Sequence, residues 1–437
     1  MKSWKVPVTA LVGAALLMTL GACAPGGTSS AAVTTETPSK DLGSEEVTLT
    51  VVTTPESGAP LDKIIAAFEE KHPNITVVNK KTTFDDYNKQ LPLQLASDSS
   101  PDLALINFVG NMAKDNLLLP LNPYTELYGW DEVFSPGELG DYSMQDNMVG
   151  SGGSNLVALP TSFYLVGVYY NKDLAEQAGI TIPPTSYDDF VSDLAKAKSA
   201  GLLPLQFGNA QGHAGFTIQE VGQSIDGADS ARDWVWGKPG NTFDTEGNRK
   251  GVQSLVDWNK AGYFPSATEV NGTDLADAVG KFTAGQGTFF IDGNWDSATI
   301  DKAMGDNVGF FTFPGEKATA AGGSAAYAIS AKSKHPNAAA AFLDFFHSPE
   351  ASEAVFEYGF LPKNVSALTA PEGSVQNDIL TSFGEVSADN GGVGAYANAT
   401  ASMNDTLTKT TQDLLSGSTD PDSLIEAVQA DWTKSHG

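Results

Sequence analysis

The side chains that could perform chemistry do not assemble into a known catalytic motif. The five histidines are His72, His213, His335, His347 and His436. None belongs to an H-E-x-x-H motif or to a pair spaced i, i+4, so we expect no helical zinc site. The chain also lacks a G-x-S-x-G turn and a G-x-x-x-x-G-K-[ST] phosphate loop. These absences predict a protein that is not an enzyme and needs no metal and no cofactor.

Carboxylates leave one enzymatic alternative open. The chain has 53 Asp and Glu residues, and a glycoside-active enzyme needs two of them at a fixed separation across a cleft. Spacing along the chain cannot establish such a pair, and abundant carboxylates are more often a solvated surface. The formal net charge of -28 also repels phosphate backbones, which excludes a nucleic-acid partner.

Hydrophobic periodicity indicates the elements that must position any site. Hydrophobic residues make up 41% of the 437 residues, enough for a sizeable core. Strands are expected at residues 47–51, 75–78, 166–170, 288–291 and 327–330, and helices at 61–68, 187–194, 275–282 and 424–432. Ser186 and Asp189 form a plausible N-cap pair for the second helix. Alternating helices and short apolar strands predict an α/β fold with mostly parallel sheets.

The N-terminus has the layout of an export signal. Lys2 and Lys5 precede an uncharged apolar stretch, 6–20, which is too short to span a membrane comfortably. The run Leu20-Gly21-Ala22-Cys23 resembles the lipobox of bacterial lipoproteins. We therefore expect a signal peptide at 1–22, a lipid on Cys23 and a flexible tether over 23–46. The alternative is an ordinary secretory signal with an incidental cysteine.

Four further segments, in order, carry a family resemblance. They are Ser99-Ser100-Pro101-Asp102-Leu103-Ala104; Leu159-Pro160 followed by Tyr169-Tyr170-Asn171-Lys172-Asp173-Leu174 and Pro183-Pro184-Thr185-Ser186-Tyr187; Phe282-Thr283-Ala284-Gly285 with Gly293-Asn294-Trp295; and Gly322-Gly323-Ser324 with Tyr327-Ala328-Ile329-Ser330 and Ser348-Pro349-Glu350. Together they resemble the extracellular solute-binding proteins of sugar importers, the maltose-binding-protein-like class. The resemblance implies a two-lobed, type II periplasmic-binding-protein-like α/β fold, with a ligand cleft between lobes joined by hinge strands.

By the same resemblance, the lobes comprise residues 47–160 plus 316–365 and residues 163–315 plus 366–437. The implied function is that of a substrate-binding lipoprotein of an ABC importer, which captures an oligosaccharide by hinge closure and delivers it to the permease subunits. We expect a monomer that is held by the Cys23 lipid at the extracellular face of the cell membrane. A binding protein for a polyamine or another non-sugar solute, and a sensor component, are alternatives.

The resemblance also implies ligand-binding residues. They are Trp295, Asn294, Tyr164, Glu56, Asn107, His213, Tyr327, Asp389, Asn390 and Tyr396. Trp295 is expected to stack on a sugar ring, and the others to supply polar or aromatic contacts. For Trp295 and Tyr327 the alternative is burial in the core, and Phe163 could face the cleft instead of Tyr164. Gly391 to Gly394 are expected to form a flexible surface turn, and Trp234 and Trp236 either pack internally or lie at the cleft rim.

Overall fold

Strands β6 (Leu159–Asn171) and β10 (Ala320–Ile329) organise the structure. This computed structural model describes residues 36–55, 57–363, 365 and 368–437. The signal peptide, Cys23 and Glu56 lie outside the described residues. Within those residues, no helix combines the length and the apolar character that a membrane crossing requires.

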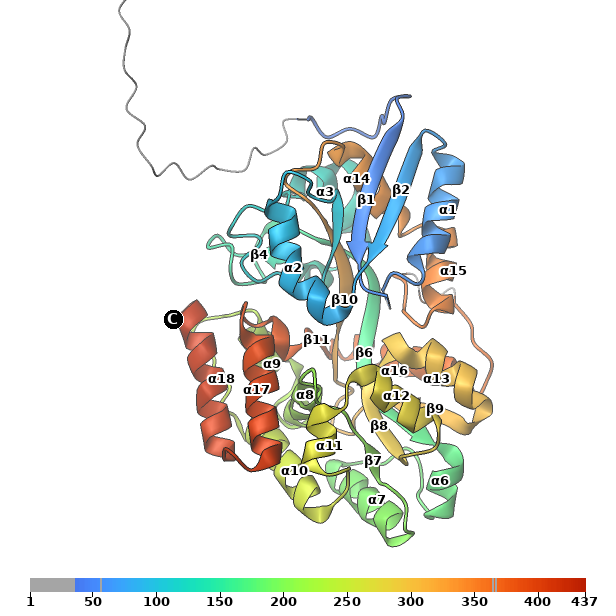
Figure 1. Cartoon of the computed structure of the whole chain (residues 1–437), viewed down its shortest axis with the longest axis vertical. Coiled ribbons are helices and arrows are strands. Elements are labelled where there is room, and N and C mark those ends of the chain that lie inside the picture. Colours follow the sequence, from blue (N-terminus) through green and yellow to red (C-terminus); the bar gives the residue numbers. More distant parts are fainter. Residues whose placement is uncertain (1–35, 56, 364, 366–367) are drawn as a thin grey trace, which may run out of the picture. The chain divides into compact units, whose positions relative to one another are not determined.

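A nine-stranded sheet connects two lobes in the described part of the chain (Figure 1). Its strand order is β2-β1-β3-β10-β6-β8-β7, with β9 pairing with β6 and β11 with β10. The remaining strands are β1 (Val47–Thr53), β2 (Ile75–Lys81), β3 (Leu103–Ile106), β7 (Leu205–Gln206), β8 (Phe289–Gly293), β9 (Val308–Phe311) and β11 (Gly392–Val393), and β4 (Ser143–Met144) pairs with β5 (Asn155–Leu156) outside it.

The two long strands belong to both lobes. Residues 159–165 of β6 pair with β10, whereas residues 166–171 pair with β8 and β9. The end of β10, residues 326–329, pairs in turn with β3 in the other lobe. The chain therefore passes from one lobe to the other within continuous strands (Figure 1). The expected lobe boundaries remain a prediction.

The prediction of mostly parallel sheets is wrong. Strand β10 runs antiparallel to β3 and β6, and β6 runs antiparallel to β8 and β9. A strand that carries the chain out of a lobe and one that brings it back must run in opposite directions. Parallel pairing occurs where a helical crossover joins neighbours, as helix α1 (Leu61–Lys71) joins β1 and β2.

The α-helices cover both faces of the sheet. They are α1 (Leu61–Lys71), α2 (Phe84–Ala96), α3 (Asn122–Tyr128), α4 (Trp130–Val133), α5 (Pro136–Gly140), α6 (Lys172–Gln177), α7 (Tyr187–Ser199), α8 (Ala214–Asp226), α9 (Ala228–Val235), α10 (Glu246–Ala261), α11 (Ala267–Gly272), α12 (Leu275–Thr283), α13 (Ser297–Met304), α14 (Pro336–Phe345), α15 (Pro349–Glu357), α16 (Val375–Ala388), α17 (Met403–Ser416) and α18 (Pro421–His436). The four predicted helices are confirmed, as is the Ser186 cap, whose side chain accepts a hydrogen bond from Asp189 N.

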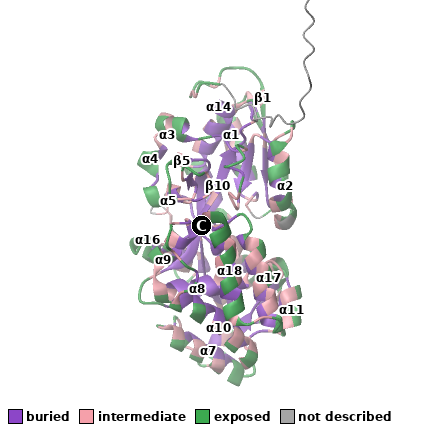
Figure 2. Ribbon diagram, turned by 90° about the vertical axis from the view of Figure 1, so that its left-hand side faces the viewer, coloured by how far each residue is buried: buried purple, intermediate pink, exposed green. Residues whose placement is uncertain are grey.

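Apolar side chains fill the interior of both lobes, and Figure 2 shows that the central strands are buried. One core surrounds β1 and β3, and all four residues of β3 are buried. The other surrounds Phe190 of α7, whose ring contacts four aromatic rings: Trp258, Phe289, Phe311 and Phe313. The first core is not confined to one lobe, because it also includes Phe282 of α12 and Phe290 of β8.

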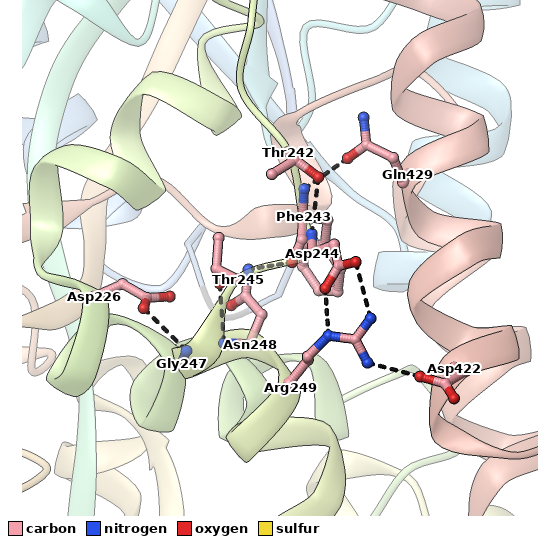
Figure 3. A network of polar contacts seen from close by, with 10 residues as sticks. All are labelled: Asp226, Thr242, Phe243, Asp244, Thr245, Gly247, Asn248, Arg249, Asp422 and Gln429. Carbon is pink, nitrogen blue, oxygen red and sulfur yellow. Dashed lines mark hydrogen bonds and ion pairs between the residues drawn. The ribbon is translucent and has the colours of Figure 1, made fainter.

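Helices α10 and α18 are joined by the polar network of Figure 3. Arg249 of α10 donates to Asp244 and, over 2.6 Å, to Asp422 of α18. Asn248 donates to Phe243 O over 3.0 Å and accepts a hydrogen bond of 2.8 Å from the Tyr396 hydroxyl. The network therefore fixes the position of Tyr396.

The structure decides between the two alternatives for Trp234, which lies in α9, and Trp236, which follows it. Trp234 is buried and packs against Tyr396 and Trp432. Trp236 follows the helix, and its indole N–H donates to Asp141 Oδ1 over 2.8 Å. Asp141 follows α5 in the other lobe (Figure 2). Trp234 is thus a core residue, and Trp236 makes an interlobe contact.

Candidate ligand-binding site

A cavity of about 350 Å³ lies between the two lobes. One wall comes from loops after β1, β2 and β3, including Ser57, Phe84 and Phe108. The other comes from the segments that carry His213 and Trp295. Its volume is that of a small-molecule pocket, and a ligand within it contacts both lobes.

Trp295 is the central aromatic side chain of one wall. It lies in the 3-10 turn Asn294–Asp296 that follows β8. Its ring centroid is 5.6 Å from that of Tyr164 and 5.8 Å from that of Phe216. A Cβ at Gly293 would overlap the indole, which explains why glycine precedes the tryptophan in the Gly-Asn-Trp sequence. All three aromatic rings are only half-buried and line the cavity.

Tyr164, not Phe163, faces the cavity. Successive side chains of a strand point to opposite faces, and on β6 the buried Phe163 packs 6.0 Å from the ring of Phe383. Tyr164 is therefore placed on the cavity side, beside Trp295.

Sequence reasoning missed the aromatic pair of the opposite wall. Phe84 and Phe108 lie 6.1 Å apart, edge to face, and both line the cavity. Phe84 begins α2 shortly after β2, and Phe108 follows β3. Carboxyl ends of parallel strands meet at one edge of a sheet, where ligands commonly bind. That rule could have identified both residues. Phe216 lies one helical turn beyond His213 and was also missed.

The polar groups of the cavity are mostly neutral. Asn107 donates to Asn88 Oδ1 over 3.1 Å, which orients its side chain. Gln211 Oε1 accepts a hydrogen bond from Leu275 N, and Asp274 caps α12 by accepting from Asp277 N. Among the described residues that line the cavity there is no lysine or arginine, and Asp274 is the single carboxylate. An anionic ligand would therefore find no opposite charge.

His213 and Asp292 lie together at the wall that carries Trp295, with the side chain of His213 14% exposed. Asp292 of β8 is fully buried, and its Oδ1 lies 3.5 Å from His213 Nε2. Burial lowers the pKa of His213 to about 4, against the opposing effect of Asp296, so the ring is neutral at pH 7. Burial raises the pKa of Asp292 to about 7, although hydrogen bonding by Gly293, Asp296 and Trp295 opposes this rise.

The structure brings five of the expected ligand-binding residues together. Trp295, Tyr164, Asn107, His213 and Tyr396 all line the cavity. The hydroxyl of Tyr396 is engaged by Asn248. Glu56 lies outside the described residues, between two residues that line the cavity, Pro55 and Ser57. Contact between these residues and a ligand remains a prediction.

Two expected site residues are buried outside the cavity lining. Tyr327 is buried on β10, stacks on Phe346 at 5.3 Å and forms a hydroxyl–hydroxyl hydrogen bond of 3.1 Å with Thr53. Asn294 is fully buried, donates to Gly359 O over 2.7 Å and accepts from Leu165 N over 3.0 Å. Neither side chain lines the cavity, because both are held in the interior by partners far away in the chain.

Asp389 and Asn390 also lie away from the cavity. Asp389 accepts a hydrogen bond of 3.0 Å from Ala318 N, and the carbonyl of the exposed Asn390 accepts one from Arg232. The prediction of a flexible surface turn at Gly391 to Gly394 is wrong, because Gly392 and Val393 form β11 beside β10. A Cβ at Gly391 would overlap Ala318 O. The glycine therefore allows close approach of the two segments.

Replacing Asn294 by alanine should lower the free energy of unfolding by about 2–4 kcal/mol. The substitution leaves Leu165 N–H and Gly359 C=O buried without their partner, and each unsatisfied group costs about 1–3 kcal/mol. Urea denaturation measures the change. Asn111→Ala, at an exposed position, is the matched control and should change stability by less than about 0.5 kcal/mol. Unchanged stability with lost ligand affinity would instead make Asn294 a ligand contact.

No metal centre is apparent in the described ranges. There, no group of three or more His, Cys, Asp and Glu side chains is arranged to hold a metal ion. Of the pair His213 and Asp292, only His213 lines the cavity.

Residues 52–353 match the family of bacterial extracellular solute-binding proteins, and the chain belongs to this family. It is a family of non-enzymatic binding proteins, and the interlobe cavity fits that class. The chain is 28% identical over 328 residues to an uncharacterised ABC transporter extracellular-binding protein of Pyrococcus horikoshii, covering 72% of this chain and 71% of that one.

Two other comparisons extend this result. A multiple sugar-binding protein of Streptococcus mutans is 23% identical over 331 residues, covering 73% of this chain and 75% of that protein. The solved structure of a chitin oligosaccharide binding protein superposes with a TM-score of 0.74 at 24% identity, covering 90% of this chain and 100% of that chain. The second match confirms the periplasmic-binding-protein-like α/β fold expected from the sequence.

Proposed function

We propose that this protein is the carbohydrate-binding component of an ABC importer, and that it captures an oligosaccharide between its lobes and delivers it to the permease. The observation that carries the proposal is the interlobe cavity with half-buried aromatic rings on both walls, Phe84 and Phe108 facing from one lobe and Trp295 from the other. Sugar rings present C–H faces to such rings and hydroxyls to amides. The names of the Streptococcus mutans relative and of the superposed structure support a sugar ligand.

Capture follows from the position of the cavity. A ligand that contacts both walls binds the closed arrangement better than an open one, so it shifts the population toward closure. The long strands β6 and β10 connect the lobes, and a hinge needs only a few residues that absorb a change of backbone angles. The permease then distinguishes the loaded form by its closed surface. The lobes that move are residues 47–160 plus 316–365 and residues 163–315 plus 366–437.

A lipid anchor completes the proposal. Cleavage after residue 22 and diacylglycerol transfer to Cys23 hold the protein at the extracellular face, and residues 23–46 act as its tether. The support is the order of basic residues, apolar stretch and Leu20-Gly21-Ala22-Cys23. Cys23→Ser should release the protein into the culture medium, whereas the wild type should stay with the membrane fraction and incorporate labelled fatty acid. Wild-type protein without lipid would contradict the anchor.

A thermal-shift panel tests the sugar proposal. We expect one class of di- to pentasaccharide to raise the melting temperature of the mature chain saturably, because a ligand that binds only the folded state stabilises it. The recovered sugar should be unchanged, and calorimetry should give one site. Spermidine and amino acids are the controls. A shift with spermidine alone would favour a polyamine ligand, although Asp274 is the only carboxylate among the described cavity residues.

A further inference from the structure

The buried Asp292 contacts a residue of the cavity but does not itself line it. It is on β8, three residues before Trp295, and its side chain is fully buried. The titratable groups around it are His213 at the start of α8, Asp296 in the turn after β8, and Tyr169 of β6. The hydroxyl of Tyr169 donates to Gly293 O over 2.9 Å. The 3.5 Å approach to His213 is one route by which Asp292 can act on the cavity, beside its interaction with Trp295.

The two nitrogens of His213 have different surroundings. Nε2 is buried 3.5 Å from Asp292 Oδ1, and neither atom has a hydrogen-bond partner in the described part of the chain. Nδ1 has no hydrogen-bond partner among the described residues and is not fully buried. It is therefore open to the cavity that the ring lines. In a neutral imidazole one nitrogen carries the proton and the other accepts. The hydrogen bond made at one nitrogen decides which of them is protonated.

We propose that Asp292 is a positioning residue for the ligand and acts through His213: its carboxylic acid donates to Nε2, so that Nδ1 carries the proton and presents an N–H donor to a ligand oxygen. This inference rests on the proposed function for the place of the ligand. A hydroxyl, ring or carbonyl oxygen of a sugar is a suitable acceptor. His213 thereby acts as a hydrogen-bond donor to the ligand, and Asp292, which does not line the cavity, decides that it donates rather than accepts.

Under this proposal, whether Nδ1 of His213 donates or accepts a hydrogen bond depends on pH. When Asp292 loses its proton, its carboxylate accepts a hydrogen bond, so the imidazole proton moves to Nε2 and Nδ1 becomes an acceptor. Burial raises the pKa of Asp292 to about 7, which is well above the usual value for aspartate. The raised pKa places this change near neutrality. Affinity should therefore be highest below pH 7 and fall as the pH rises, since the bound oxygen then faces a lone pair.

Ring nitrogen NMR on the mature protein measures the tautomer without any ligand. In ¹⁵N-histidine-labelled protein, we expect His213 to show a protonated Nδ1 and a bare Nε2 at pH 6, and the reverse at pH 8.5. His213→Gln assigns the signals by removing them. His347 is an internal control, because it is also buried with its pKa lowered to about 4, by burial and then by the charge of Lys363. A His213 ring protonated at Nε2 at pH 6 would overturn the proposal.

Asp292→Asn is the matched variant. Asparagine has nearly the same shape, does not titrate and can donate its amide N–H to Nε2, so the tautomer of His213 should stay the same from pH 6 to 8.5. Calorimetry with the sugar found in the thermal-shift panel should show wild-type affinity falling by about three- to tenfold over this range, the effect of one hydrogen bond. The variant should bind with nearly constant affinity. An equal decline in both proteins would overturn the proposal.

Asp296→Asn separates the two carboxyl groups near the ring. Asp296 influences both His213 and Asp292, and the tautomer change should persist in this variant. Loss of the change in Asp296→Asn but not in Asp292→Asn would assign the role to Asp296 and overturn the proposal. If Asp292→Asn does not fold, the wild-type tautomer titration still decides. A panel with no sugar bound would contradict the proposed function, while the tautomer measurement judges the action of Asp292 on the ring.

Discussion

Replacing Trp295 by alanine should weaken binding of the sugar by at least about 30-fold. The indole packs against the rings of Tyr164 and Phe216 and is half-buried in the wall of the cavity. Truncation removes the apolar face and leaves its neighbours less well packed. Truncating a central aromatic contact of this kind costs about 2 kcal/mol or more, and 1.4 kcal/mol corresponds to a factor of ten. Isothermal titration calorimetry with the sugar identified in the thermal-shift panel measures the effect.

Two variants control this result. Trp295→Phe keeps an aromatic face and should retain part of the affinity. Trp258→Phe alters a tryptophan that is buried in the core around Phe190, away from the cavity, and should leave affinity within about twofold. A dissociation constant of Trp295→Ala within threefold of the wild type would show that the indole is a structural residue, the alternative that the sequence leaves open.

Replacing Phe190 by alanine should lower the free energy of unfolding by about 3–5 kcal/mol. Its side chain is fully buried, and ring centroids of Phe289 and Phe313 both lie 5.3 Å away. Alanine removes apolar contacts and leaves a cavity that rigid aromatic neighbours cannot fill. Urea denaturation followed by tryptophan fluorescence reports the loss, because Trp258 is 5.9 Å from the ring.

The control for Phe190 is leucine at the same position. Phe190→Leu keeps most of the apolar volume and should cost about 1.5 kcal/mol or less. A saturating sugar should raise the stability of each variant by the same amount, because linkage depends on affinity for the folded state. An alanine variant that loses less than about 1 kcal/mol would show that this aromatic cluster is not tightly packed.

The local pattern of the sequence was enough to predict the elements. Leu61, Ile64, Ile65 and Phe68 recur at helical spacing, and all four are buried in α1. Ser186 stands before α7 and caps it. Both predictions held because helix periodicity and capping depend on residues within a few positions of one another. The resemblance of Gly293-Asn294-Trp295 to the family segment likewise predicted a cavity tryptophan, and the structure shows that a Cβ at Gly293 would overlap its indole.

The tertiary structure decided the directions of the strands and the partners of polar and aromatic side chains. The sequence predicted mostly parallel strands, but β6 and β10 cross between lobes and run antiparallel to their neighbours. Asn294 and Tyr327 carry side chains suited to a sugar, yet Gly359 and Thr53 hold them in the interior. A polar or aromatic side chain has no intrinsic preference for a ligand over a buried partner, so only the neighbours decide its role.

The sequence by itself determined the class of fold, the binding rather than catalytic character and the place of Trp295. Only the tertiary structure brought Phe84 and Phe108 opposite that tryptophan and Asp292 against His213. The physical reason is the sequence separation of the residues that interact. Periodicity, caps and turns arise from contacts between near neighbours, whereas the cavity is formed by loops that are distant in the chain and meet only when the strands pair.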